Sequence, residues 1–212
     1  MESIIIVCAG MNGREALSII EACNQWMENE ALKAQYKVLG FIDDNLQALE
    51  GTGIQVPILG KIADWQPIGD EQYVIGSAIP ATKEKLVSML KQRGCRFMTL
   101  IAPWTLMSRD CELGEGCFVE GYSISAGVKI GNFVNVNASM IAPGAVIGDY
   151  TTTTGFAVVE NAVVGKRVFI GSNTVITSGV HVGDDVQVSA GSIVTDDVPA
   201  GATVFGVPAR QI

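Results

Sequence analysis

A six-residue period in the second half of this 212-residue chain constrains its fold more than any other feature. Aliphatic residues recur at every sixth position: Val158, Val164, Ile170, Ile176, Val182, Val188 and Val194. Four positions after each comes a small or β-branched residue: Ala162, Val168, Thr174, Val180, Val186, Ser192 and Val198. The same spacing occurs earlier, at Phe118, Ile124, Ile130 and Val136. Helices and sandwich strands repeat at ~3.6 and ~2 residues. The period therefore predicts a parallel β-helix of hexapeptides, with three short strands per coil of about 18 residues.

The period is interrupted twice by a one-residue deletion. The step from Val136 to Ile141 is five residues, the steps to Ile147 and Thr153 are six, and the step from Thr153 to Val158 is five again. We expect each deletion to tighten a corner or displace one strand, because the stacking of coils keeps the register elsewhere.

Residues 1–100 follow a different rhythm, in which apolar runs alternate with helical periodicity. The runs predict strands at 4–10, 36–45, 56–65 and 73–80, and helices at 14–27 and 81–94. Thr82 is the predicted cap of the second helix, and Gly94 follows its last turn. Such alternation gives a small, mostly parallel α/β sheet. Because the rhythm changes near Pro103, we predict an α/β domain at 1–102 and a β-helix at 103–212.

Composition narrows the functional classes. With 48% hydrophobic and 17% charged residues, the chain reads as a compact soluble protein. The formal net charge of −8 disfavours a nucleic-acid binder, which needs a basic face. Anionic ligands are still compatible, because backbone N–H groups can bind phosphate. The first apolar run, six residues long, is too short for a signal peptide or a membrane span.

The five cysteines predict a reducing compartment. Their number is odd and none forms a CxxC pair: Cys8, Cys23, Cys95, Cys111 and Cys117. Free thiols in the cytoplasm are favoured over disulfides or a zinc site, so we expect no metal ion.

Four motifs together resemble one protein family: CAGMNG at 8–13, FIDDN at 41–45, the hexapeptide period and GVPARQI at 206–212. The family is that of bacterial sugar acyltransferases, which includes sialic-acid O-acetyltransferases and bacillosamine-type nucleotide-sugar N-acetyltransferases. The resemblance covers nearly the whole chain. It implies a Rossmann-like α/β domain that binds a nucleotide-sugar, followed by a left-handed parallel β-helix that binds acyl-CoA. It also implies a homotrimer with shared active sites and acetyl-CoA as a co-substrate, without a tightly bound cofactor.

The resemblance assigns substrate contacts to the α/β domain. Gly10, Met11 and Asn12 form the ligand-binding turn, although the family usually has a histidine where Asn12 stands. Asp43 and Asp44 match an acidic pair that contacts the nucleoside, and Gly76 lines the same pocket. Taken without the resemblance, the two aspartates are equally explained as a solvated turn after a strand.

In the β-helix, the positions that match family acyl-CoA contacts are Thr151, Ser172, Ala190, Gly206, Val207 and Pro208. The last three correspond to the adenine end of the ligand. Each residue is also of a type that a β-helix corner needs for packing.

No residue matches the family's general base. The histidine position falls at Ala142, Pro143 and Gly144, and a second family histidine falls near Thr151 and Thr152. A third substitution places Ala102 and Pro103 where a His-Pro usually leads into the β-helix. The only histidine, His181, precedes the inward Val182, so we expect it to point to solvent. The catalytic residue is therefore unassigned.

Two interpretations remain open. In the first, the protein N-acetylates an aminosugar nucleotide without a histidine base, because an amine needs less activation than a hydroxyl group and proximity supplies much of the rate. Hydroxyl groups of residues 151–154 are candidates for the oxyanion contact, and Asn137 stands where the family has an asparagine. In the second, the fold is retained for binding or assembly and catalysis is lost. Sugar O-acetylation is a further alternative.

Overall fold

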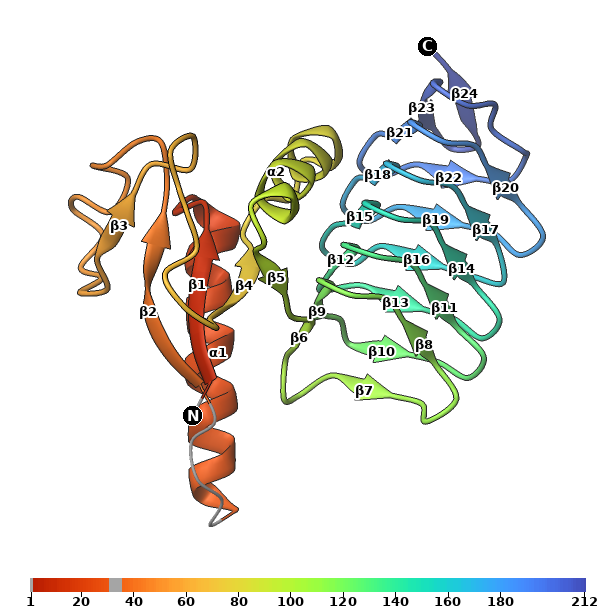
Figure 1. Ribbon diagram of the computed structural model, residues 1–212. Coiled ribbons are helices and arrows are strands. Elements are labelled where there is room, and N and C mark those ends of the chain that lie inside the picture. Colours follow the sequence, from red (N-terminus) through yellow and green to blue (C-terminus); the bar gives the residue numbers. More distant parts are fainter. Residues whose placement is uncertain (1, 31–35) are drawn as a thin grey trace.

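The computed structural model describes residues 2–30 and 36–212. Figure 1 shows an α/β unit, built from the first hundred residues, beside a tall stack of β-helix coils. The α/β sheet has five parallel strands in the order β3-β2-β1-β4-β5. These strands are β1 Glu2–Val7, β2 Tyr36–Ile42, β3 Ile58–Gly60, β4 Gln72–Ile75 and β5 Arg96–Phe97. The helices are α1 Met11–Asn29 and α2 Pro80–Gln92.

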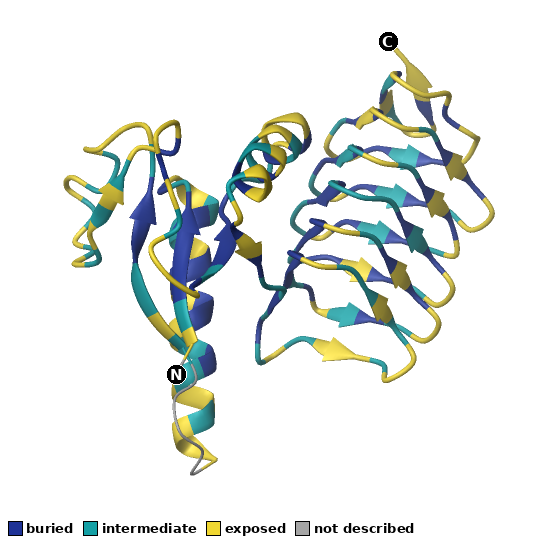
Figure 2. Cartoon of the chain, in the orientation of Figure 1, coloured by how far each residue is buried: buried dark blue, intermediate teal, exposed yellow. Residues whose placement is uncertain are grey.

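The central strand β1 is buried on both faces, which explains its continuous apolar run. Ile4 and Ile6 pack with the buried residues of α1, and Ile5 and Val7 pack with those of α2. Figure 2 shows this strand in the buried colour along most of its length. The side chains alternate because successive strand residues point to opposite faces. One helix therefore covers each face of the sheet.

The helix boundaries differ from those predicted. Helix α2 begins at Pro80 after Ile79, which gives no side-chain cap, so the prediction of Thr82 as the cap is wrong. Proline suits the first helical position because its φ angle is already helical and no N–H bond is lost there. Gly94 follows the helix with φ +89°, as expected of a residue that ends it.

The second half of the chain forms a left-handed parallel β-helix with three sheets. Sheet X contains β6 Leu100–Ile101, β9 Phe118–Glu120, β12 Asn135–Asn137, β15 Thr152–Thr153, β18 Phe169–Ile170, β21 Gln187–Val188, β23 Thr203–Gly206 and β24 Ala209–Gln211. Sheet Y contains β7 Leu106–Met107, β10 Ser123–Ile124, β13 Met140–Ile141, β16 Val158–Val159, β19 Val175–Ile176 and β22 Ile193–Val194. Sheet Z contains β8 Glu112–Leu113, β11 Lys129–Ile130, β14 Val146–Ile147, β17 Val163–Val164 and β20 His181–Val182. The chain crosses from the α/β sheet to sheet X between Phe97 and Leu100, a few residues before the predicted division.

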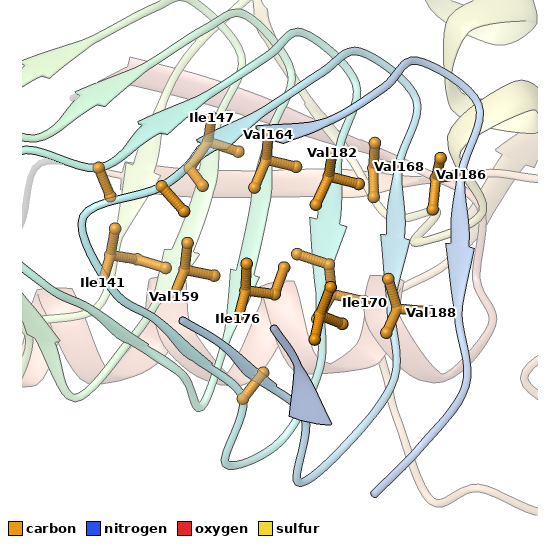
Figure 3. Packing of buried hydrophobic residues seen from close by; sticks show 14 of the residues in the cluster. Ile141, Ile147, Val159, Val164, Val168, Ile170, Ile176, Val182, Val186 and Val188 are labelled. Atoms are coloured by element: carbon orange, nitrogen blue, oxygen red, sulfur yellow. The ribbon is translucent and has the colours of Figure 1, made fainter. Parts of the chain in front are cut away.

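Aliphatic side chains, one from most of the strands, fill the interior of the prism, and β15 contributes the buried Thr153. Figure 3 shows Ile141, Val159 and Ile176 of sheet Y in one row and Ile147, Val164 and Val182 of sheet Z in another. The corner residues Val168 and Val186 lie beside these rows (Figure 3). All eight belong to one continuous buried cluster, so the six-residue period marks the core as predicted.

The second predicted deletion is displaced by one strand. Val159 is 0% exposed and lies in the core, whereas its neighbour Val158 is partly exposed. The step from Thr153 to Val159 is therefore six residues, and the five-residue step falls between Val159 and Val164. The prediction chose the wrong member of a Val-Val pair, because both members fit a hexapeptide period.

The prediction that Phe118 belongs to the inward-facing period is also wrong. Val119 faces the prism interior, and Phe118 packs instead with the α1 side of the α/β core. The side chain of Phe118 is buried there because the α/β unit covers this part of the outer face of sheet X.

The two units are joined by polar and aromatic contacts. The ammonium group of Lys83 in α2 donates to Asn135 Oδ1 at 2.6 Å, to Thr152 Oγ1 at 3.1 Å and to the carbonyl oxygen of Thr151 at 3.3 Å. The ring of Phe97 meets that of Phe133 edge-on, with 5.3 Å between centroids. These contacts hold the carboxyl edge of the α/β sheet close to the coils.

Candidate functional site

The turn after β1 is packed so closely that neither Gly13 of α1 nor Gly76, which follows β4, can carry a side chain. A Cβ atom on Gly13 would lie 1.9 Å from the carbonyl oxygen of Cys8, and one on Gly76 would lie 2.5 Å from the Cα atom of Gly13. The N–H of Gly76 also donates to Val7 O at 2.7 Å. Gly76 therefore has a packing role at the base of the turn. Its place in the lining of a substrate pocket stays a prediction.

Asp43 and Asp44 organise the loops at this edge of the sheet. Asp43 accepts hydrogen bonds from the N–H groups of Ala9 at 2.7 Å and Asn45 at 2.8 Å. Asp44 accepts one from Ala63 N–H at 3.0 Å. The pair is thus more than a solvated turn, since Asp43 fixes the backbone just before Gly10. Its contact with a nucleoside stays a prediction.

A cavity lies where the start of α1 faces the β-helix. It has a volume of about 280 Å³ and is lined by Met11, Asn12 and Glu15 from α1 and by Glu120 and Asn137 from sheet X. The N-cap residue Gly10 gives α1 no side-chain cap, so N–H groups of the first turn are free to bind a ligand. The structure therefore brings Met11 and Asn12 together with Asn137 at one cavity.

Sequence reasoning missed both carboxylates of this cavity. Burial raises the pKa of the Glu120 carboxyl group, and the negative charge of Glu15 raises it further. The side-chain oxygen of Asn137 is buried without a hydrogen-bond partner in the described chain. Glu120 and Asn137 are paired across adjacent coils, a register that no motif in the sequence reveals. A buried, unpaired amide oxygen is costly unless a ligand binds it.

Most of the predicted acyl-CoA residues lie on one edge of the prism. The corner where the chain leaves sheet X for sheet Y, here called the XY edge, carries Glu120, Asn137, Thr154, Ser172, Ala190 and Gly206 in order along its length. Thr154 Oγ1 lies 3.1 Å from Ser172 Oγ, and Ser172 O accepts from Gly191 N–H at 2.8 Å. The next coil ends at Gly206, with Val207 and Pro208 beyond it. The XY edge thus runs from the C-terminal turn to the cavity.

Thr151 does not share this edge. It has no exposed surface, and its hydroxyl group donates to Gly165 O at 2.8 Å and accepts from Val168 N–H at 3.0 Å. Thr152 and Thr153 are also 0% exposed. For these three residues the predicted oxyanion contact is wrong, because their hydroxyl groups are buried in the fold. Thr154 is the member of the set that reaches the XY edge.

The corner at Ala142, Pro143 and Gly144 lies between sheets Y and Z, here called the YZ edge. It is therefore on a different edge of the prism from the cavity in the same chain. Pro143 and Gly144 are exposed, and Gly144 has φ +76°. His181 is exposed on the outer face of sheet Z, with Nδ1 3.7 Å from Asp197 Oδ1, so the prediction that it faces solvent is confirmed.

The five cysteines are free thiols: Cys8, Cys23, Cys95, Cys111 and Cys117. Burial is the main cause that raises the pKa of Cys117 to about 11 and that of Cys8 to about 12. These two thiols are therefore protonated and poor nucleophiles at neutral pH. In the part of the chain that the structure describes, neither helix is both long and apolar enough to cross a membrane.

The repeat matches a known protein family. Residues 157–196 match the model described as the hexapeptide repeat of succinyl-transferase. No curated protein matches the chain significantly by sequence.

Three solved structures share the hexapeptide-repeat fold together with the α/β unit. The acetyltransferase domain of PglB from Neisseria gonorrhoeae is 18% identical, with a TM-score of 0.84 and 100% of both chains covered. WeeI from Acinetobacter baumannii is 28% identical, with a TM-score of 0.82 and again 100% of both chains covered. A variant of perosamine N-acetyltransferase from Caulobacter crescentus, solved with CoA and GDP-perosamine, is 20% identical, with a TM-score of 0.83 and coverage of 100% of this chain and 97% of its own.

Proposed function

We propose that the chain is an acyltransferase that moves an acetyl group from acetyl-CoA to an amino group of a nucleotide-linked sugar. The observation that carries this proposal is the meeting of two surfaces at one cavity. The turn at Gly10, Met11 and Asn12 opens into it from the α/β unit, and the XY edge leads into it from the C-terminal turn. A donor and an acceptor that bind along these two surfaces meet at Asn137.

The α/β unit suits a nucleotide-sugar. A parallel sheet binds ligands at the carboxyl ends of its strands, and the Rossmann-like turn after β1 brings free N–H groups of α1 to that edge. Asp43 and Asp44 lie at the end of the neighbouring strand, where they can accept hydrogen bonds from a ribose or a base. The Caulobacter enzyme has been solved in complex with GDP-perosamine, which supports a nucleotide-sugar as the substrate here.

The XY edge suits the pantetheine arm of acetyl-CoA. Small residues there, Ser172, Ala190 and Gly206, leave backbone groups accessible to an extended chain. Val207 is 68% exposed and Pro208 follows it, so this turn can cover an adenine ring at the end of the edge. The PglB domain has been solved with acetyl coenzyme A, which supports the same donor here.

A homotrimer completes the site in this proposal. The outer face of sheet Y is mostly apolar: Leu106 and Met140 are exposed and Val158, Val175 and Ile193 are half-buried, with Ser123 as the polar member of the row. The stacked pair of Tyr122 and Phe156 flanks it, with 5.8 Å between ring centroids. Exposed apolar patches of this kind mark protein interfaces.

Threefold symmetry about sheet Y has a geometric consequence for the site. It places the XY edge of one subunit beside the YZ edge of the next, so Ala142, Pro143 and Gly144 of a neighbour would border the cavity. The donor groove is then formed between two subunits. Buried free thiols fit a reducing cytoplasm as the place of the reaction.

An amine acceptor is favoured over a hydroxyl group. No histidine lies at the cavity, and the single histidine of the chain, His181, is on sheet Z. A neutral amine attacks a thioester without prior deprotonation, whereas a hydroxyl group gains far more from a strong base.

The test is release of the CoA thiol from acetyl-CoA in the presence of a panel of nucleotide-sugars. Each aminosugar nucleotide is matched with the sugar that carries a hydroxyl group at the same carbon, and binding of both ligands is measured by calorimetry. We expect CoA release with at least one amine and none with its hydroxyl counterpart. Binding of both ligands without release across the amines would instead indicate a catalytically silent assembly protein, and faster release with a hydroxyl acceptor would indicate O-acetylation.

A further inference from the structure

Glu120 is a half-buried carboxylate at a corner of the β-helix. It ends β9 at the XY edge, next to Asn137 in the adjacent coil, and its side chain lines the cavity that α1 faces. In residues 2–30 and 36–212 no cation pairs with it. A partly buried carboxylate without a cation is unfavourable, so its place in the cavity indicates a ligand that carries a proton or a positive charge.

Among the described residues, Glu15 is the only other ionisable group in the lining of this cavity. Lys83 is 0% exposed and its ammonium group is bonded to three oxygen atoms. His181 lies on the outer face of sheet Z. Glu15 is on the exposed side of α1 and faces the cavity from its rim. Glu120 is the carboxylate that shares the XY edge with the proposed thioester site.

We propose that the Glu120 carboxylate is the proton acceptor for the acceptor amine. This inference rests on the proposed acetyl transfer. The amine nitrogen attacks the thioester carbonyl carbon with its lone pair, and the π electrons move to the carbonyl oxygen. The nitrogen gives a proton to Glu120 as the tetrahedral intermediate collapses, the C–S bond breaks, and the CoA sulfur leaves with the electron pair. The proton then passes from Glu120 to the sulfur, so the products are the amide and the CoA thiol.

The groups around Glu120 determine how the rate of acetyl transfer changes with pH. Glu15 from α1 is the charged group that faces Glu120 across the cavity, and the other polar lining residues, Asn12 and Asn137, are uncharged. Burial and Glu15 both hold the pKa of Glu120 above its ordinary value, and the carboxylate is the reactive form. The rate therefore falls as the pH drops through this raised pKa.

The experiment compares pH profiles of kcat/KM for CoA release in the wild type and three variants, with one aminosugar nucleotide as acceptor. Glu120→Gln removes the proton acceptor and keeps the size of the side chain. Glu15→Gln removes the neighbouring charge. Glu112→Gln is the matched control, since Glu112 is an exposed carboxylate of sheet Z that pairs with Lys129. Affinity for acetyl-CoA is measured for each protein, so that a folding or donor-binding defect is recognised.

We expect Glu120→Gln to lower kcat/KM by about 100-fold or more while acetyl-CoA binding is kept. At low pH the wild type reacts only when both the acceptor amine and Glu120 have lost a proton. The Glu120→Gln variant requires the loss of a proton from the acceptor amine alone. Glu15→Gln should move the acid limb to lower pH, and Glu112→Gln should match the wild type.

Two outcomes would overturn the inference, and only the second would also overturn the proposed function. If the wild type transfers acetyl groups and Glu120→Gln keeps both its rate and its pH profile, Glu120 is not the proton acceptor and the proposed function stands. If the wild type releases no CoA with any amine, the proposed function fails and the inference fails with it.

Discussion

At the scale of single residues, the structure contains stabilising contacts that no sequence motif reveals. Lys83 is a buried lysine whose three hydrogen bonds connect α2 to sheet X. Burial lowers the pKa of its ammonium group to about 7. The folded state therefore loses this proton at lower pH than the unfolded chain does, and stability should rise with pH above that value.

We predict that the free energy of unfolding of the wild type increases between about pH 7 and about pH 8.5. The unfolded chain keeps the lysine proton in this range and the folded protein releases it. Lys83→Met should lose this dependence, although it is also destabilised because Asn135 Oδ1 is left without a donor. Urea unfolding at several pH values measures both effects. Equal slopes with pH in the two proteins would contradict the lowered pKa.

A second residue-scale prediction concerns the turn after β1. Gly13→Ala should lower the free energy of unfolding by about 3 kcal/mol, because the new methyl group would overlap the carbonyl group of Cys8. Gly10→Ala is the control, since nothing lies within 4 Å of its Cβ position. Denaturant unfolding of the two variants should separate them clearly, and a similar loss in both would show that the close packing is wrong.

At the scale of elements, the β-helix follows from side-chain periodicity, and its finer register does not. The hexapeptide period identified the coils because only one side chain per strand can enter the narrow prism. It misplaced β16 because Val158 and Val159 are chemically identical, and only packing distinguishes the inner one.

This register can be measured by truncation within the one strand. Val159→Ala should cost about 2 kcal/mol of unfolding free energy through a core cavity, and Val158→Ala should cost clearly less. Thermal or urea unfolding of both variants provides the comparison. The reverse order would restore the register predicted from the sequence.

The candidate site was predictable only in part, for similar reasons. The turn at Met11 and Asn12 and the edge at Ser172 and Ala190 matched recognisable motifs, and the fold brings both toward Asn137. Glu120 belongs to no motif, since its importance arises from the partnering of adjacent coils and from the approach of α1. The hydroxyl groups of threonines 151–153 were candidates for the oxyanion contact. They are buried, which the sequence does not show, and therefore cannot reach a ligand.

At the scale of the whole molecule, the proposed site depends on assembly. Within one chain the XY edge is an open ridge, and Ala142, Pro143 and Gly144 lie on the other side of sheet Y. Packing of three copies around sheet Y would turn the ridge into a groove with walls from two subunits.

We predict that Met140→Asp produces a monomer that no longer releases CoA. Met140 is 48% exposed on the apolar face of sheet Y, where a charge would be buried by a neighbour. Val163→Asp is the matched control, because Val163 is 42% exposed on sheet Z and would stay in solvent. Light scattering coupled to gel filtration gives the mass of each protein. A trimeric Met140→Asp protein, or a monomeric wild type, would contradict the proposed interface.

In the proposed complex the acyl donor lies along the XY edge and ends at the cavity that α1 faces. A crystal structure of the protein with bound acetyl-CoA would show the position of the donor. We expect the pantetheine arm to pass Ser172 and Ala190 and the thioester to lie within hydrogen-bonding reach of Asn137 or Glu120. A donor bound along another edge of the prism, or a thioester remote from this cavity, would contradict this placement.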